Sequence, residues 1–256
     1  MRPRVLIPYA NGTNRDRDLA DAFEHAGATP ITIPLSTLIE TQPCWENYQM
    51  LALPGGFVEA DILGAGKLLA LTLNQHLGDL LQHFIAHKKP IIGICNGFQA
   101  LIKAGLLPAL KTPHTQPEAT LTHNAQGHFE CRWVTLLPSS QRCLWTRDLS
   151  EPIDCPIAHG EGQFLVADPI YRQLDAQDQI VLRYARPNGQ VAQGHYPNNP
   201  NGSTHDIAGI CNPEGNILGL MPHPENAIFP WQHPQWTRGI KAHLGLSLFQ
   251  QGVRYA

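Results

Sequence analysis

The sequence lacks the features that mark membrane proteins and nucleic-acid-binding proteins. No stretch approaches the run of about 18 uncharged apolar residues that a membrane-spanning helix requires. The N-terminus, MRPRVLIPYANG, contains no long apolar segment with a small-residue cleavage site. A net charge of −3 provides no field that would attract nucleic acid or an anionic membrane. We therefore expect a cytoplasmic protein whose partners are small molecules or other proteins, with no nucleic acid and no membrane among them.

Metal-binding and nucleotide-binding motifs are missing as well. The chain contains no C-x-x-C pair, which argues against a zinc site and against a disulfide scaffold. No G-x-x-x-x-G-K-[ST] phosphate-binding loop is present, so we do not expect this chain to bind ATP. The six scattered cysteines are expected to be reduced thiols: Cys44, Cys95, Cys131, Cys143, Cys155 and Cys211.

The sequence does contain a short pattern around Cys95 that is typical of a nucleophile. Residues 90–94 form an apolar run too short for a helix, so a strand buried on both faces is predicted, followed by a helix from Phe98. Between them, Gly93-x-Cys95-x-Gly97 is the cysteine counterpart of the G-x-S-x-G nucleophile elbow. A helix N-terminus offers unpaired N–H groups and a positive dipole end, which favour a thiolate. Cys95 is therefore a candidate nucleophile, and the alternative is a small buried apolar residue.

Two further loops are expected beside this corner. A predicted strand at 48–53 ends in Pro54-Gly55-Gly56-Phe57, where the glycines let backbone N–H groups approach a ligand or simply permit a turn. Beside an elbow on the next strand, this loop is the expected place for a second oxyanion donor. The loop Gly12-Thr13-Asn14 should reach the same sheet edge, because parallel strands bring their carboxyl ends together. An ordinary turn is the alternative.

A second candidate cluster is the segment Met221-Pro222-His223-Pro224-Glu225. Pro224 excludes His223 from the helical region, and residues two apart in extended chain point to the same side, so His223 and Glu225 can converge. A carboxylate bonded to one imidazole nitrogen leaves the other free to take a proton from a thiol. His223 would then be the base and Glu225 its orienter. The alternatives are a rigid surface turn, or a metal site with His233 whose spacing matches no recognised motif.

The order of the predicted elements indicates a single α/β domain over residues 1–256. A strand at 4–8, a helix at 16–25 and a strand at 29–35 form an opening β-α-β unit. A helical stretch is predicted over 61–87, with Gly78 as a candidate interruption and with an apolar face that begins at Ile62 and serves core packing.

The second half is predicted to be mostly strands and loops, arranged as an antiparallel β layer added to the domain. Residues 112–126 have the composition of a loop or lid. Residues 234–250 are predicted to form a closing helix, with apolar residues at Trp236, Ile240, Leu244 and Phe249. Strand-like segments lie at 127–137, 157–158, 164–167, 179–185, 190–195, 206–211 and 216–220, the last two forming a hairpin.

Together, GICNGFQ, PGGF and MPHPE resemble class I (triad) glutamine amidotransferase domains, in which an elbow cysteine and a distant His-x-Glu hydrolyse the glutamine side-chain amide. The resemblance extends across nearly the whole chain. GTN followed by RD, GICNGFQALIKAGLLP, AHGEG, NPNGS and DIAGICNPEGNILGLMPHPE are similar to segments of the glutaminase subunits of phosphoribosylformylglycinamidine synthase, an enzyme of purine synthesis.

This resemblance implies a flavodoxin-like fold with a central, mostly parallel sheet flanked by helices. It also implies a catalytic triad and an oxyanion hole, formed by Cys95, His223 and Glu225 and by the N–H groups of Gly56 and Asn96. Residues around bound glutamine would be Gly55, Gln99, His159 and Gly160. No role follows for Glu130 or Arg132 in the segment GHFECR.

The resemblance further implies a larger ATP-using synthetase partner and, in many organisms, a small bridging subunit. ATP and magnesium would bind that partner, and no cofactor is expected in this chain. The sequence departs from the family in two places: Arg15 stands where a cysteine commonly follows GTN, and FVEADILG stands where FSYGDYLR commonly follows PGG. These departures concern the surface that faces the partner.

Three alternatives remain open at this point. The chain could be the glutaminase subunit of another synthase, such as that for GMP or pyridoxal phosphate. It could be a catalytically silent regulatory or scaffold module of the same fold. It could also be a stand-alone hydrolase that works without a partner and ignores glutamine.

Overall fold

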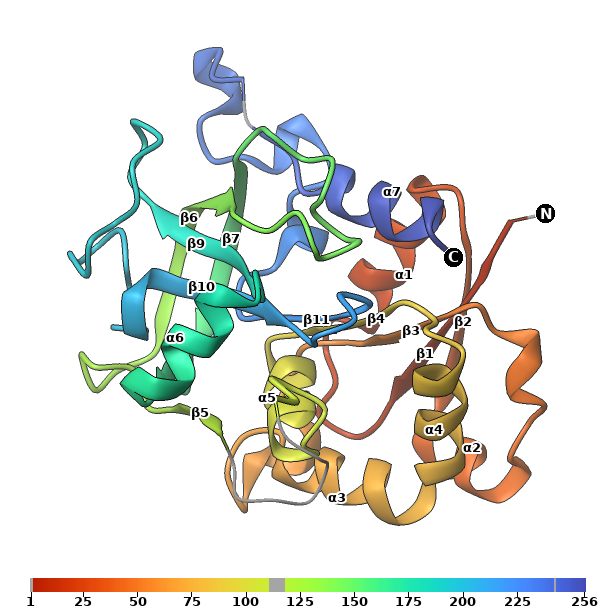
Figure 1. Ribbon diagram of the computed structural model, residues 1–256. Coiled ribbons are helices and arrows are strands. Elements are labelled where there is room, and N and C mark those ends of the chain that lie inside the picture. The colour runs from red at the N-terminus through yellow and green to blue at the C-terminus, as the bar shows by residue number, and fades with distance from the viewer. Residues whose placement is uncertain (1, 111–117, 242) are drawn as a thin grey trace.

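A nine-stranded mixed sheet forms the centre of the computed structural model, which describes residues 2–110, 118–241 and 243–256 (Figure 1). The strand order is β2-β1-β3-β4-β11-β10-β9-β6-β7. The first five strands in this order are parallel: β2 Thr29–Pro34, β1 Arg4–Tyr9, β3 Met50–Leu53, β4 Ile91–Ile94 and β11 Ile217–Leu220. The remaining strands pair antiparallel: β10 Ile207–Cys211, β9 Ile180–Ala185, β6 Glu130–Pro138 and β7 Ile153–His159.

Helices cover both faces of the parallel half of the sheet (Figure 1). One face carries α1 Asp16–His25 and α7 Leu246–Arg254, and the other carries α3 Lys67–His76, α4 Gly78–Ala86 and α5 Asn96–Lys103. Because both faces are covered, the central strands are apolar at every position, and all residues of β3 and β4 are buried. Two shorter helices are α2 Leu35–Thr41 and α6 Asp168–Ala176. No helix in the described ranges is long and apolar enough to cross a bilayer.

The α/β class, the opening β-α-β unit and the hairpin before MPHPE are confirmed. The antiparallel strands, however, extend the edge of the central sheet and do not form a separate layer, so the sheet is half antiparallel. The small sheet beside it pairs β5 Ala119–Thr122 with β8 Gln163–Val166. The predicted loop at 112–126 is therefore wrong where β5 lies, and its residues 112–117 fall outside the described ranges.

Several predicted boundaries are wrong. The stretch 61–87 is two helices, and the second begins at Gly78, the residue named as a candidate interruption. The first helix begins only at Lys67, because Glu59, Ala60 and Asp61 have positive φ. No strand forms at 190–195, apart from an isolated bridge at Val191. Helix α6 was not predicted, although Asp168 followed by a proline is a helix-start signal.

The closing helix begins at Leu246 and not at residue 234. Residues 234–245 contain a short 3-10 turn, Trp236–Arg238, that ends at Gly239 in a left-handed conformation. The side chains of Trp236 and Ile240 are exposed, so their helical spacing did not reflect a buried face.

Candidate active site

Cys95 lies at the sharp corner between β4 and α5. Its backbone has φ 52° and ψ −106°, a conformation rarely adopted by a residue with a side chain. A Cβ atom at Gly93 would lie 2.6 Å from Leu101, and one at Gly97 would overlap the carbonyl oxygen of Leu53. Both positions of the G-x-C-x-G pattern therefore require glycine, because the helix packs directly on the strands. The structure has the predicted elbow.

The first turn of α5 presents an N–H group beside the Cys95 sulfur. The carbonyl of Cys95 accepts the N–H of Gln99 at 3.0 Å, so Asn96 is the first helical residue. Within the described ranges the N–H of Asn96 has no acceptor. The side chain of Asn96 is held in place by donating to Asp61 Oδ1 at 3.0 Å and to Gln99 Oε1 at 3.1 Å.

Gly56 supplies a second N–H group, which has no acceptor among the residues that the structure describes. The segments 12–14 and 55–57 pair antiparallel around Thr13 and Gly56, with the N–H of Phe57 donating to Gly12 O at 2.8 Å. In this pairing the N–H of Gly56 points away from the GTN loop. Gly56 has φ 143°, and a Cβ atom there would lie 2.6 Å from the carbonyl oxygen of Gly12. Only glycine fits, and the predicted approach of the GTN loop to this edge is confirmed.

His223 and Glu225 form a buried pair next to Cys95. Nδ1 of His223 lies 2.6 Å from Oε1 of Glu225, and both side chains are almost fully buried. Their convergence was predicted, but its reason was wrong: Glu225 lies in the 3-10 turn Pro224–Asn226, which begins directly after His223. Burial opposes the charged imidazolium, yet Glu225 and then Cys95 outweigh it and raise the pKa of His223 to about 10.

Cys95 lines two cavities that share part of their walls. The first, of about 290 Å³, is named the glutamine cavity from here on because three of the four predicted substrate residues line it. The second, of about 250 Å³, is named the His223 cavity because His223 lines it together with Asn14, Arg15 and Cys131. Both are lined by Gly56, Phe57, Cys95, Phe129 and Ala158.

The predicted substrate residues fall into two groups. Gln99, His159 and Gly160 line the glutamine cavity, whereas Gly55 packs against the His223 ring, where a Cβ atom would lie 2.8 Å from Cε1. Both ends of the Gln99 amide are already bonded within the protein, since Nε2 donates to the carbonyl of Glu161 at 2.7 Å.

His159 is buried and electrically neutral. Burial is the main cause that lowers the pKa of His159 to about 3, and the neighbouring His223 acts in the same direction. Its Nδ1 lies 3.1 Å from Oδ1 of Asn124, whose amide nitrogen donates to the carbonyls of His128 and His159. Because the amide orientation is fixed by those two bonds, Nδ1 of His159 carries the proton.

The sequence pattern missed three residues at this site: Asp61 and Glu161, which line the glutamine cavity, and Asn124, which orients His159. Glu161 lies in AHGEG and Asp61 in FVEADILG, but neither segment gave these residues a role, and Asn124 lies in none of the motifs. Glu130 and Arg132, which had no predicted role, form an ion pair of 2.7 Å. Arg132 continues this network by donating to the Tyr196 hydroxyl at 2.5 Å.

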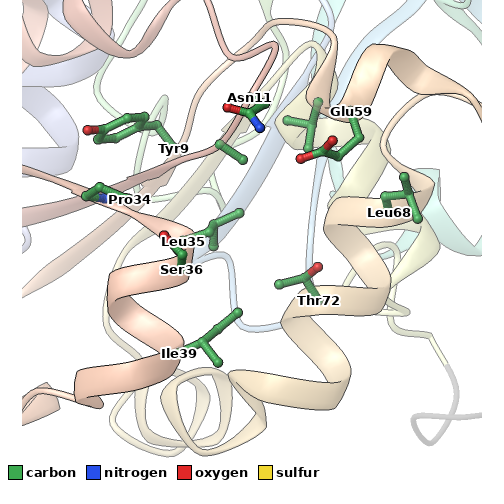
Figure 2. A pocket seen from close by; sticks show the side chains of 11 residues that line it. Tyr9, Asn11, Pro34, Leu35, Ser36, Ile39, Glu59, Leu68 and Thr72 are labelled. Atoms are coloured by element: carbon green, nitrogen blue, oxygen red, sulfur yellow. The ribbon is translucent and has the colours of Figure 1, made fainter.

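A larger cavity, of about 330 Å³, lies at the carboxyl ends of β1 and β2 and contains none of the predicted site residues. Figure 2 shows its wall, with Asn11 and Glu59 on one side and Ile39 and Thr72 on another. In the described ranges, no group of three or more His, Cys, Asp or Glu side chains is arranged to hold a metal ion.

Comparison with known proteins identifies the family. Residues 2–256 match the CobB/CobQ-like glutamine amidotransferase domain. Subunit PurQ of phosphoribosylformylglycinamidine synthase from Treponema denticola is 46% identical, over 100% of this chain and 99% of its own length. The chain belongs to the PurQ family of glutamine amidotransferases. The PurQ subunit from Methanococcus maripaludis is 37% identical over 91% of this chain and 86% of its own length.

A solved structure of the same family supports the fold. The structure of PurLQS from Thermotoga maritima superposes with a TM-score of 0.74 at 31% identity, covering 100% of this chain and 99% of that one. Membership of the PurQ family confirms the resemblance seen in the sequence, and the superposition confirms the class I amidotransferase fold.

Proposed function

We propose that this chain is the glutaminase subunit of a phosphoribosylformylglycinamidine synthase. It hydrolyses L-glutamine to glutamate and supplies ammonia to an ATP-dependent synthetase, which converts formylglycinamide ribonucleotide to its amidine in purine synthesis. One observation carries the proposal: in a member of the PurQ family, a cysteine at a nucleophile elbow shares a cavity with a histidine that pairs with a buried glutamate.

The proposed reaction begins with the thiolate of Cys95. His223 is protonated at neutral pH, because its pKa is raised to about 10. The positive charge of this imidazolium favours the thiolate form of a neighbouring thiol. The sulfur adds to the carboxamide carbon of glutamine, and negative charge develops on the amide oxygen. The N–H groups of Asn96 and Gly56 are the proposed donors to that oxygen. Each such donor lowers the activation barrier by about 3 kcal/mol.

Glu225 occupies Nδ1 of His223, which leaves Nε2 to exchange protons. Nε2 gives its proton to the amide nitrogen, the carbon–nitrogen bond breaks, and ammonia leaves a γ-glutamyl thioester on Cys95. His223 then takes a proton from water, whose oxygen attacks the thioester carbon, and glutamate is released as the thiolate forms again.

The proposed partners are the large synthetase subunit and a small bridging subunit, in a cytoplasmic complex. One relative of known structure is named PurLQS. ATP and magnesium are proposed to bind the synthetase, because this chain carries no phosphate-binding loop of the Walker type. This chain would need no cofactor of its own for the thioester chemistry.

Labelling with a glutamine-mimicking diazo ketone, followed by peptide mapping, tests the site. We expect stoichiometric modification of Cys95, faster in the presence of the purine synthetase, and loss of glutamine hydrolysis in the assembled complex for Cys95→Ala. Cys131→Ala is the matched control, because this second thiol lines the same His223 cavity without the elbow. Labelling at another residue would overturn the site. Unchanged hydrolysis in Cys95→Ala would identify a silent module, and activation only by another synthase would reassign the partner.

A further inference from the structure

Asp61 lies in the wall of the glutamine cavity, together with Cys95 and Gly56. Its Oδ1 accepts hydrogen bonds from the Asn96 side chain at 3.0 Å and from the N–H of Gly66 at 3.4 Å. Within the described ranges its other oxygen, Oδ2, has no partner. The carboxylate is therefore fixed in orientation and retains one free acceptor beside the nucleophile.

The side chains that line this cavity carry negative charge and no positive charge. Asp61 and Glu161 both line it, whereas the lining contains no lysine or arginine among the described residues, and His159 is neutral. Lys103 lies close by, but its ammonium group donates to the carbonyl of Ala65. Burial raises the pKa of Asp61, and Glu161 adds to that effect. Together they outweigh the opposing hydrogen bonds from Asn96 and Gly66 and the charge of Lys103.

The backbone reaches Asp61 through an unfavourable conformation. Glu59, Ala60 and Asp61 all have positive φ, at 51°, 55° and 52°. This local cost is offset by contacts that hold the segment, including the N–H of Glu59 donating to Asn11 O at 2.9 Å. The result separates two carboxylates that are two residues apart in the sequence. Glu59 lines the cavity of about 330 Å³ at the ends of β1 and β2 (Figure 2), whereas Asp61 lines the glutamine cavity together with Cys95.

Glutamine carries the charge that this wall lacks. Its carboxamide is neutral and must lie at Cys95, while its α-ammonium group is four bonds away, a reach of about 5 Å in extended chain. We propose that Asp61 binds the α-ammonium group of glutamine through Oδ2, and so selects free glutamine over amides that lack this charge. The inference rests on the proposed function, because it takes glutamine as the substrate.

The test pairs one enzyme change with one substrate change. Glutamine hydrolysis is compared with that of glutaramate, which is glutamine without its α-amino group, in the complex with the synthetase. The variants are Asp61→Asn, which keeps an acceptor for Asn96, and Glu59→Gln, which makes the same charge change two residues away on an exposed side chain. Protection of Cys95 from iodoacetamide by each compound measures binding even where turnover is slow.

In the wild-type complex, kcat/KM should be about 10- to 100-fold lower for glutaramate than for glutamine, as expected for a lost charge-assisted hydrogen bond. Asp61→Asn should lower kcat/KM for glutamine by a similar factor, chiefly by raising KM, and leave glutaramate within about threefold. Glu59→Gln should behave as wild type.

Three outcomes would overturn the role of Asp61. Equal losses for both substrates would mean that Asp61 only positions the elbow through Asn96. An unchanged KM for glutamine would remove it from recognition. Loss of discrimination in Glu161→Gln but not in Asp61→Asn would assign the ammonium group to Glu161. If the wild-type complex failed to hydrolyse glutamine, the proposed function itself would be wrong, and the two failures are thus distinguishable.

Discussion

Nδ1 of His223 lies 2.6 Å from Oε1 of Glu225, in a place where neither side chain has appreciable contact with solvent. The pair sits directly after β11, which runs parallel to β4, the strand that ends at the elbow. The N–H of Cys95 donates to the carbonyl of Leu220 at 2.8 Å, so the two strand ends are in register. The sheet therefore brings the thiol and the imidazole together at one edge.

We expect Glu225→Gln to lower glutamine hydrolysis by about four orders of magnitude, as substitution of the orienting carboxylate does in other triads. The side-chain N–H of Gln at position 225 can donate to Nδ1 of His223. This bond favours the tautomer that carries its proton on Nε2, which cannot then accept a proton from the thiol. The substitution also removes the charge that contributes most to raising the pKa of His223, so that pKa should fall below its wild-type value of about 10. NMR titration of the His223 ring and the pH dependence of Cys95 alkylation measure this change.

Glu151→Gln is the control for that variant. Glu151 also lies near a histidine, at 3.6 Å from His243, but both side chains are exposed. An ion pair in solvent contributes little, so activity and the pH profile should be unchanged. If Glu225→Gln retained most of the hydrolysis rate, Glu225 would not orient the base.

The local parts of this site were predictable from sequence. Apolar runs between glycines identify β3 and β4, and the spacing around Cys95 identifies the elbow, because both depend on neighbours in the chain. The proline before Glu225 indicated a special backbone there, although the pattern gave an extended segment where the structure has a 3-10 turn. The likeness to known amidotransferases linked the two segments, whose contact depends on β4 pairing with β11.

Other parts had no usable local signal. Asp61 faces the cavity only because three residues without glycine's freedom adopt positive φ, which composition does not reveal. Asn124 acts through His159, so its role depends on a contact between separate strands and loops. Conversely, Trp236 and Ile240 have helical spacing, but their side chains are exposed and do not pack on the core. The chain forms a short 3-10 turn there, and the predicted closing helix does not begin at residue 234.

Gly56→Ala should lower kcat for glutamine by about 100- to 1,000-fold, the typical effect of losing one oxyanion donor. The added methyl group would meet Gly12 O at 2.6 Å, and φ 143° is strained for alanine, so the N–H should turn away from the amide oxygen. Steady-state kinetics measure the effect, and alkylation of Cys95 shows whether the elbow stays intact.

The control for Gly56 is Gly105→Ala, which also has positive φ, at 77°, but has open space around the added methyl group. This variant should show only the modest loss of stability expected for a left-handed alanine. Its kcat should remain near wild type. A similar loss of kcat in both variants would mean that general strain, and not the Gly56 N–H, limits the reaction.

His159 should make the protein sensitive to acid. The folded state keeps it neutral down to about pH 3, whereas the unfolded chain binds a proton near pH 6.5. Its contribution to stability is therefore complete above pH 6.5 and is lost as the pH falls toward 3, at about 1.4 kcal/mol per pH unit. Urea unfolding of wild type and His159→Gln between pH 7 and about pH 4.5 should show a shallower decline for the variant.

His195→Gln provides the comparison, because His195 is exposed and should leave the acid slope unchanged. The free energy of unfolding of His159→Gln can be lower at pH 7, since Asn124 loses its ring partner, and the prediction concerns the slope alone. Equal slopes in wild type and His159→Gln would show that His159 is not the group that limits stability in acid.

Gly97→Ala tests whether the elbow depends on direct contact between helix α5 and strand β3. A methyl group at Gly97 would overlap the carbonyl oxygen of Leu53, a backbone atom that cannot move without shifting the strand. We expect a loss of about 1–3 kcal/mol in the free energy of unfolding, together with slower alkylation of Cys95. Gly78→Ala, where nothing lies within 4 Å of the added methyl group, should instead match or exceed wild-type stability. If both alanines were tolerated equally, the packing of α5 on β3 would not be what fixes the position of the nucleophile.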